Sequence, residues 1–289
     1  MYTVDRAFQD FMIHNERKNL SPESMRYYRE NITRFIKWLS GNHIFKPNRL
    51  TEKIADDYFL FLLRTVLNRT SVNTYMRAVR RFLNYLSEQG ITKPIKVAPL
   101  KERFKIKNTF DLNETELILK SVQPNDDTSV IMLLLLACGM RSRSVRELRV
   151  SDVHINDRYI DICHTKSGEP LCLPISREVA IVLQQYIAIY GRRDLLFENS
   201  RGGMFNRDSL AKRMNKRLRA LGIPKHKSGV HIFRHTFGKI MSMNSCPTAV
   251  LQKWFGHADI RITQRYVDLY GNELKNTMSM LPTSTFQYA

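Results

Sequence analysis

The stretch VIMLLLLACGMR, residues 130–141, contains the longest apolar run of the chain. A continuous apolar run of this length predicts a buried helix. It is too short to span a bilayer, because a transmembrane helix needs about 20 apolar residues. Gly139 breaks the run, and Arg141 follows at the edge of the predicted helix. An arginine there is partly desolvated and binds anions strongly, although an ordinary ion pair between helices is also compatible with the pattern.

The charge of the chain predicts a polyanionic partner. Its 289 residues include 46 lysines and arginines against 27 aspartates and glutamates, a net charge of +19. A surplus of this size favours nucleic acid. An anionic membrane surface is the main alternative, and a soluble protein kept apart by self-repulsion is the simplest explanation. The hydrophobic content of 43% is ordinary for a chain with a buried core, and the length suits one large domain or two of usual size.

Cysteine usage and the N-terminus favour a cytoplasmic protein. The cysteines form no CxxC pair, and a chain of this length does not need disulfides, so we predict reduced, buried thiols. They are Cys138, Cys163, Cys172 and Cys246. Charged residues interrupt the N-terminal segment, so no secretory signal peptide is predicted. No membrane-spanning segment is expected either.

The first hundred residues have the pattern of a helical domain. Residues 21–40 begin with Ser21 and Pro22, a helix cap followed by a first-turn proline, and then repeat apolar residues at helical spacing. Residues 51–66 and 71–90 show the same spacing, and Gly90 is a typical helix stop.

Basic residues gather on one face of the predicted helix 71–90. Arg77, Arg80 and Arg81 have i, i+3, i+4 spacing, and no acidic partner is expected on that stripe. The stripe is either a solvated basic face or a phosphate contact, and we favour the contact. Residues 91–110 then combine prolines with many basic residues, which predicts a basic linker.

The second half of the chain predicts a mixed domain. A helix begins at NETE, where Asn113 is the expected cap and Glu116 the return partner of a capping box. Residues 158–176 predict two short strands around a Ser-Gly turn. Helices are predicted at 177–190, 207–221, 231–243, 248–255 and 260–270.

These patterns predict a mostly α fold with a small β-sheet, in two domains. The predicted parts are a helical domain at 1–95, a basic linker at 96–110, an α+β domain at 111–270 and a tail at 271–289.

The segment HIFRHTF, residues 231–237, can bind either a metal or an anion. His231 and His235 are four apart, which suits a metal on a helix. No glutamate follows His231, however, and no third ligand is near in sequence, so we predict no metal. His231 and Arg234, three apart, can instead hold an anion from one side of the helix. His235 is equally well explained as an interior histidine.

Three further residues have chemistry but little weight alone. Lys166 lies in the predicted turn between the two strands, where a lysine can donate a proton. His257 follows Gly256, and Tyr266 lies nine residues further on.

Taken together and in order, these segments resemble the tyrosine recombinase family, which includes phage-type integrases, Xer-type recombinases and transposon resolvases. CGMRSRSVRELRVSDV resembles the box around the family's first arginine, and TKSGEPLCLPI its lysine-bearing hairpin. HIFRHTF resembles the H-x-x-R-H box, and FGHADIRITQRYVD the terminal box with the tyrosine nucleophile. The basic helical N-terminal region is similar to the core-binding, SAM-like domain of the family. The resemblance therefore covers nearly the whole chain, and it implies a two-domain DNA clamp made of a helical core-binding domain and an α+β catalytic domain.

The resemblance implies a catalytic set. Tyr266 attacks a scissile DNA phosphate and forms a 3′-phosphotyrosyl bond, His231 takes its proton, and Lys166 protonates the leaving 5′ oxygen. The transition-state charge is held by Arg141, Arg234 and His257. His235 is expected only to brace the helix behind them. Neither a metal nor any other cofactor or ATP is expected.

The resemblance also implies partners and a pathway. We expect double-stranded DNA with short inverted half-sites, monomers in solution, a homotetramer on DNA, and sequential strand exchange through a Holliday junction. The protein is then nucleoid-associated when bound. Basic residues expected to contact DNA are Arg77, Arg80, Arg81, Lys101, Arg103, Lys105 and Lys107. The tail 271–289 is expected to dock on a neighbouring subunit.

The biological role stays open between several members of this class. A mobile-element integrase or transposon cointegrate resolvase is favoured. A chromosome-dimer-resolving Xer-type recombinase, a type IB-like DNA-relaxing enzyme and a non-catalytic DNA-binding protein are the alternatives.

Two features depart from or complicate the family pattern. Ser144 stands where the family usually has an acidic residue that helps orient the first arginine. Tyr270, one helical turn after Tyr266, is a competing nucleophile, although the spacing from His257 favours Tyr266.

Overall fold

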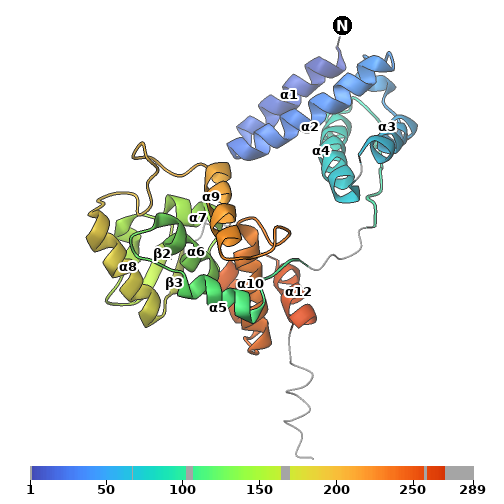
Figure 1. Ribbon diagram of the computed structural model, residues 1–289. Helices are drawn as coiled ribbons and strands as arrows, with labels where there is room; N and C mark the ends of the chain where they lie inside the picture. Colours follow the sequence, from blue (N-terminus) through green and yellow to red (C-terminus); the bar gives the residue numbers. More distant parts are fainter. Residues whose placement is uncertain (1, 67, 102–106, 164–169, 257–258, 271–289) are drawn as a thin grey trace, which may run out of the picture. The chain divides into compact units, whose positions relative to one another are not determined.

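The computed structural model describes residues 2–66, 68–101, 107–163, 170–256 and 259–270. The predicted mostly helical fold with one small sheet is confirmed (Figure 1). The chain divides into two compact units, Met1–Phe104 and Lys105–Ala289, and each is described by itself. Within the residues that the structure describes, no helix has the length and apolar character needed to cross a membrane.

The first unit is a group of helices around an aromatic core. Ser21 accepts a hydrogen bond from the Ser24 amide, and Pro22 occupies the first turn, so the predicted helix start is confirmed. Gly90, with φ +69°, follows the last helix as predicted. The elements are α1 (Val4–Arg17), α2 (Pro22–Gly41), η1 (Pro47–Arg49), α3 (Glu52–Thr65) and α4 (Arg69–Glu88). The fully buried aromatic residues include Phe11, Phe35, Tyr58 and Phe82.

The first part of the basic segment is fixed to this helical unit. Ile95 and Val97 are buried in its core. The Asn73 side chain accepts a hydrogen bond from the Leu100 amide at 2.9 Å and donates one to the Leu100 carbonyl at 3.0 Å. The segment up to Leu100 is therefore held in this unit by packing and by the two hydrogen bonds between the Asn73 side chain and the Leu100 backbone.

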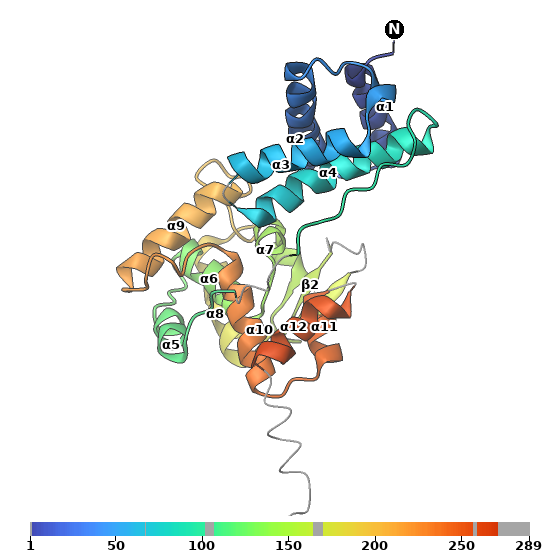
Figure 2. The same ribbon diagram turned by 90° about the vertical axis from the view of Figure 1, so that its right-hand side faces the viewer.

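The second unit is built around α6 (Asp127–Ala137), the buried helix predicted from the apolar run. Every residue from Val130 to Leu136 is buried. Helices α5 (Leu112–Lys120), α7 (Ser142–Glu147), α8 (Arg177–Tyr190), α9 (Arg207–Ala220) and α10 (His231–Met243) pack against it. Helices α11 (Thr248–Phe255) and α12 (Ile260–Tyr270) pack against α10 and against each other (Figures 1 and 2). The predicted bounds of these C-terminal helices agree with the structure to within a residue.

The sheet has one strand more than the sequence predicts. Strand β1 (Val153–His154) pairs antiparallel with β2 (Tyr159–Ile162), which pairs antiparallel with β3 (Leu171–Pro174). Strands β2 and β3 are the predicted pair. Strand β1 has only two residues and follows η2 (Val150–Asp152) directly. It is therefore too short to show the alternation of apolar and polar residues from which a strand is predicted.

The predicted cap of α5 is wrong. The cap is Asp111, not Asn113, because Asp111 and Glu114 form a complete capping box. The Asp111 carboxylate accepts from the Glu114 amide at 2.9 Å, and the Glu114 carboxylate accepts from the Asp111 amide at 2.9 Å. This reciprocal pair satisfies two amides that a cap at Asn113 would leave to solvent.

The prediction of four buried thiols is also wrong. Cys138 is buried and Cys246 partly buried, but Cys163 and Cys172 are exposed. Cys172 is exposed because side chains alternate between the two faces of β3, and its neighbour Leu173 occupies the buried face. Cys163 follows the last residue of β2.

Candidate active site

Four predicted site residues lie near one another in the second unit. Arg141 precedes α7, His231 and Arg234 lie on α10, and Tyr266 lies on α12. The charge of Arg141 lowers the pKa values of His231 and Arg234, and Tyr266 raises the pKa of Arg234. The other two predicted catalytic residues, Lys166 and His257, lie outside the described residues.

Arg234 is oriented by two backbone carbonyls. Its side chain is buried, Nη1 donates to the Gly139 carbonyl at 2.7 Å, and Nη2 donates to the Phe255 carbonyl at 2.8 Å. Gly139 lies just after α6, in a left-handed conformation with φ +60°, and Phe255 is the last residue of α11. The guanidinium thus joins two helix ends.

Arg141 adds a second, half-buried guanidinium. Its Nη2 donates to the Gly256 carbonyl at 3.2 Å, one residue beyond the carbonyl that Arg234 uses. Burial lowers the pKa of Arg141. Burial and then the charge of Arg141 lower the pKa of Arg234 to about 9, while Tyr266 acts in the opposite direction. Like charges held this close repel each other, so an anion bound between them is strongly favoured.

His231 lies at the N-terminus of α10, where backbone amides also favour an anion. Its pKa is lowered by desolvation and then by the positive charges of Arg207, Arg234 and Arg141. A phosphate bound beside these arginines would offset part of their positive charge and so raise the pKa of His231. A neutral His231 can accept a proton.

Arg207 was not predicted as a site residue. It is the first residue of α9, after the cap Asn206, and its charge acts on His231. In the sequence, Arg207 lies at an ordinary helix start, 24 positions before His231, and no motif links the two residues. Only the packing of α9 brings its charge near the site.

The hydroxyl of Tyr266 lies 2.7 Å from Nδ1 of His235. His235 was expected to brace the helix, and the structure also places it in direct contact with Tyr266. Burial lowers the pKa of His235 to about 4, and the charges of His231, Lys107 and Arg234 act in the same direction. His235 is therefore neutral at physiological pH, and one of its ring nitrogens is an acceptor.

The ring of Tyr266 is packed tightly between α10 and α11. Its centroid lies 5.4 Å from that of Phe255. At Gly238, a Cβ atom would lie 2.7 Å from two carbons of the Tyr266 ring. Glycine at this position is therefore what allows the tyrosine to approach α10 so closely.

The basic stripe on α4 is less uniform than predicted. Arg77 is exposed, but Arg80 donates to the Val97 carbonyl at 3.4 Å, and burial lowers its pKa. Arg81 pairs with Glu88 at 3.7 Å, so the expectation of no acidic partner is wrong. Glu88 lies two helical turns further on, on the same face.

The other residues predicted to bind DNA fall on the basic segment. Lys101 and Lys107 are exposed. Arg103 and Lys105 lie outside the described residues.

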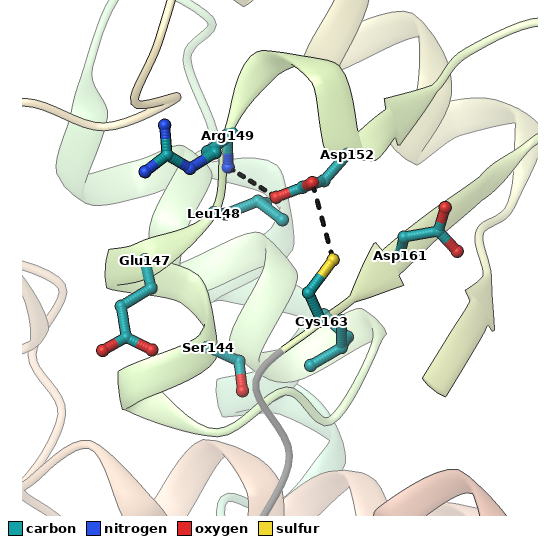
Figure 3. Close-up of a pocket in the computed structure, with 8 residues that line it drawn as sticks. Ser144, Glu147, Leu148, Arg149, Asp152, Asp161 and Cys163 are labelled. Carbon is teal, nitrogen blue, oxygen red and sulfur yellow. Dashed lines mark hydrogen bonds between the residues drawn. The ribbon is translucent and has the colours of Figure 1, made fainter. Parts of the chain in front are cut away.

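Ser144 lines a small pocket with several acidic side chains. Figure 3 shows Ser144 and Glu147 on α7, and Asp152, Asp161 and Cys163 also line this pocket. The Asp152 carboxylate accepts from the Arg149 amide at 2.9 Å and lies 3.9 Å from the Cys163 sulfur. The position where the family usually has a carboxylate is thus occupied by a hydroxyl beside other carboxylates.

No group of three or more histidine, cysteine or acidic side chains that can hold a metal is found among the described residues. His235, one of the two histidines that suggested a metal, contacts Tyr266.

Comparison with known sequences identifies both units. The profile of the Phage integrase family matches residues 106–273, and that of the phage integrase N-terminal SAM-like domain matches residues 8–90. Tyrosine recombinase XerA of Saccharolobus solfataricus is 25% identical over 274 residues, covering 95% of this chain and 82% of that protein. Tyrosine recombinase XerD of Halalkalibacterium halodurans is 23% identical over 295 residues, covering 96% and 97%. The resemblance expected from the four boxes is confirmed.

Solved structures share the fold. A Tn1549 transposon integrase in complex with a circular intermediate DNA has a TM-score of 0.76 at 17% identity, covering 97% of this chain and 100% of that chain. XerH site-specific recombinase bound to a palindromic difH substrate has a TM-score of 0.72 at 17% identity, covering 91% and 81%.

Proposed function

Because the chain belongs to the phage integrase family, we propose that it is a site-specific DNA recombinase that cuts and rejoins strands through a 3′-phosphotyrosyl intermediate. The observation that carries the proposal is the pair of arginines, Arg141 and Arg234, beside His231 and the hydroxyl-bearing Tyr266. Two guanidinium groups and a helix N-terminus favour one anion, and a scissile phosphate is an anion with a reactive centre next to a tyrosine.

In the proposed cleavage, the Tyr266 oxygen attacks the phosphorus of a DNA phosphodiester. A phosphorus–oxygen bond to tyrosine forms, and the bond to the 5′ oxygen breaks. The tyrosine proton passes to His231, and Lys166 supplies a proton to the leaving oxygen. One proton is thus lost by the nucleophile and one gained by the leaving group. Rejoining is the same step in reverse, with a 5′ hydroxyl as nucleophile.

The arginines supply the electrostatic part of the proposed mechanism. Negative charge grows on the non-bridging oxygens, and Arg141, Arg234 and His257 donate hydrogen bonds to them. The carbonyls of Gly139 and Phe255 support this role, because they orient Arg234 before the substrate arrives. We propose that no metal, cofactor or ATP takes part, since the guanidinium groups carry the positive charge and the covalent bond conserves the phosphodiester energy.

The proposed partner is double-stranded DNA with short inverted half-sites. A net charge of +19 supports a polyanion. The structural neighbours also support it, since one integrase is bound to a circular intermediate DNA and XerH to a palindromic difH substrate. We propose a cytoplasmic protein, monomeric in solution, that assembles into a tetramer on DNA, exchanges strands sequentially through a Holliday junction and docks residues 271–289 on a neighbouring subunit.

We propose a mobile-element integrase or a transposon cointegrate resolvase as the biological role. The likeness to a transposon integrase supports this role, and the Xer relatives support chromosome-dimer resolution as the second candidate.

A pool of short duplexes with randomised sequence, each nicked in one strand, tests the proposed cleavage. On such a substrate the small fragment beyond the nick diffuses away, so a cleaved strand stays attached to the protein. The wild type should yield an SDS-resistant protein–DNA adduct, and the Tyr266→Phe variant should yield none. Sequencing the trapped DNA would give the target site. An adduct that persists in Tyr266→Phe would overturn the assigned nucleophile.

Two alternative functions predict different results in these assays. A DNA-relaxing enzyme would relax supercoiled plasmids that lack the trapped sequence, whereas a recombinase requires that sequence. A non-catalytic DNA-binding protein would bind the pool but trap nothing, and Arg141→Ala and Arg234→Ala would then change affinity only.

A further inference from the structure

His235 and Arg234 are neighbours on α10 but contact different parts of the site. Arg234 reaches the carbonyls of Gly139 and Phe255. His235 reaches the Tyr266 hydroxyl, with 2.7 Å between Nδ1 and Oη. One helix thus orients both the anion-binding arginine and the hydroxyl of the tyrosine on α12.

The surroundings of His235 keep its ring neutral. The titratable and charged groups that act on it are His231, Lys107 and Arg234, all of which disfavour a second proton on the ring, as burial does. In the neutral tautomer with its proton on Nε2, Nδ1 is an acceptor and the Tyr266 O–H donates to it.

The direction of this hydrogen bond has a consequence for the oxygen. When the O–H points at Nδ1, the lone pairs of Oη point away from α10. Phe255 and Gly238 hold the ring itself, so the hydroxyl has little freedom apart from rotation about its C–O bond. By accepting the hydrogen bond, His235 fixes the rotation of the Tyr266 hydroxyl. Less conformational entropy is then lost when the oxygen is oriented for attack.

His235 is poorly suited to be the base. Its pKa is lowered to about 4, whereas a general base works best with a pKa near the operating pH. Orientation of the hydroxyl before the attack is the role that remains. The proton still leaves for His231, when the O–H turns away from Nδ1 as the new bond to phosphorus forms.

We propose that His235 is a positioning residue for the nucleophile, which accepts a hydrogen bond from the Tyr266 hydroxyl through Nδ1 and aims the oxygen lone pairs away from α10 for attack. This inference rests on the proposed function, because Tyr266 acts as a nucleophile only if the chain cleaves DNA as proposed. The contact itself exists without DNA, and it can be tested without cleavage.

The first test is NMR of the full chain labelled with ¹⁵N-histidine, without DNA. Nδ1 of His235 should have the chemical shift of an unprotonated nitrogen that accepts a hydrogen bond, and Tyr266→Phe should shift it towards that of a nitrogen without a donor. The pKa of His235 should rise in Tyr266→Phe, because the bond favours the neutral ring. A His235 signal and titration that are the same in both proteins would overturn the proposal.

The second test compares three substitutions in the nicked-duplex cleavage assay. His235→Asn places an amide oxygen near the position of Nδ1, whereas His235→Gln places it near that of Nε2, and His235→Ala removes the acceptor. We expect Ala and Gln to cleave about fivefold to tenfold more slowly than wild type, as for one lost hydrogen bond, and Asn to recover most of the rate. Circular dichroism and DNA affinity should be alike in all three.

The outcomes separate this proposal from the function. If wild type forms the adduct but His235→Ala cleaves equally fast, or Asn is no better than Gln, the positioning role is overturned and the recombinase assignment stands. If wild type forms no adduct, the recombinase assignment and the role of His235 in attack both fail, while the NMR comparison still decides whether the contact exists. If His235→Ala does not fold, the comparison of Asn with Gln and the NMR of Tyr266→Phe decide the matter.

Discussion

The guanidinium of Arg234 lies over the ring of Phe255, 4.1 Å from its centroid, and also donates a 2.8 Å hydrogen bond to the carbonyl of the same residue. Helix α11 ends at Phe255, and the same ring packs against Tyr266. The proposed oxyanion ligand and the proposed nucleophile therefore share one aromatic side chain. A change in Arg234 is expected to disturb the tyrosine as well as the phosphate.

Arg234→Lys tests whether the planar fork matters beyond its charge. A lysine keeps the positive charge but cannot bond the Gly139 and Phe255 carbonyls with two fixed donors and stack on the ring. We expect cleavage of the nicked duplex to fall at least about 100-fold, as for a lost oxyanion ligand. Arg149→Lys, at an exposed position, is the control and should cleave normally. Equal rates for both variants would argue against a preorganised clamp.

Gly238→Ala tests the close approach of Tyr266 to α10. The added methyl would lie 2.7 Å from the tyrosine ring, so α12 must move. We expect a loss of about 1–3 kcal/mol in the free energy of unfolding and slower cleavage. Gly41→Ala at the end of α2, where nothing lies within 4 Å, should be neutral or slightly stabilising. Urea unfolding of both variants measures the difference, and a stable, fully active Gly238→Ala would contradict the packing.

The buried, neutral state of His235 predicts a pH dependence of stability. Its pKa is lowered to about 4 in the folded protein, against about 6.5 for an ordinary histidine. The unfolded chain therefore binds the proton first as the pH falls. The stability contributed by the neutral ring is fully present above about pH 6.5 and is lost as the pH falls towards about 4.

Urea unfolding across this pH range measures the effect. His235→Asn should lose stability less steeply than wild type, because it has no ring to protonate. His231 contributes with the same sign, since its pKa is also lowered, so some slope should remain. An identical slope in the variant would contradict the state assigned to His235.

Salt dependence of DNA binding tests the stripe on α4. Arg77 is exposed, whereas Arg81 is paired with Glu88. If the stripe contacts phosphates, Arg77→Ala should reduce the slope of log affinity against log salt by about one, and Arg81→Ala should reduce it by less. Fluorescence anisotropy with the trapped DNA at several salt concentrations gives both slopes. A larger effect of Arg81→Ala would show that the Glu88 pair opens on DNA.

Local signals in the sequence predict much of the fold. Ser21 and Pro22 specify where α2 begins, and the apolar run 130–136 specifies the buried α6, because capping and burial of an apolar helix depend on adjacent residues. The cap of α5 was misplaced because Asp111 and Asn113 are both good caps, and only the reciprocal bond with Glu114 distinguishes them.

The site was predictable in its residue types but not in its contacts. The order of the boxes points to Arg141, Arg234, His231 and Tyr266, which the structure brings near one another. The contact between His235 and Tyr266 joins positions 31 apart and depends on how α12 packs on α10. Arg207 likewise reaches His231 only through the packing of α9. Long-range packing of this kind leaves no local pattern.

Mass spectrometry of the trapped adduct shows whether Tyr266 becomes covalently joined to DNA. After nuclease and protease digestion, one peptide should carry a residual nucleotide. We expect this nucleotide to be attached through a 3′ phosphate to Tyr266. Attachment to Tyr270 or to any other residue, or no modified peptide from a wild-type protein that binds the DNA, would contradict it.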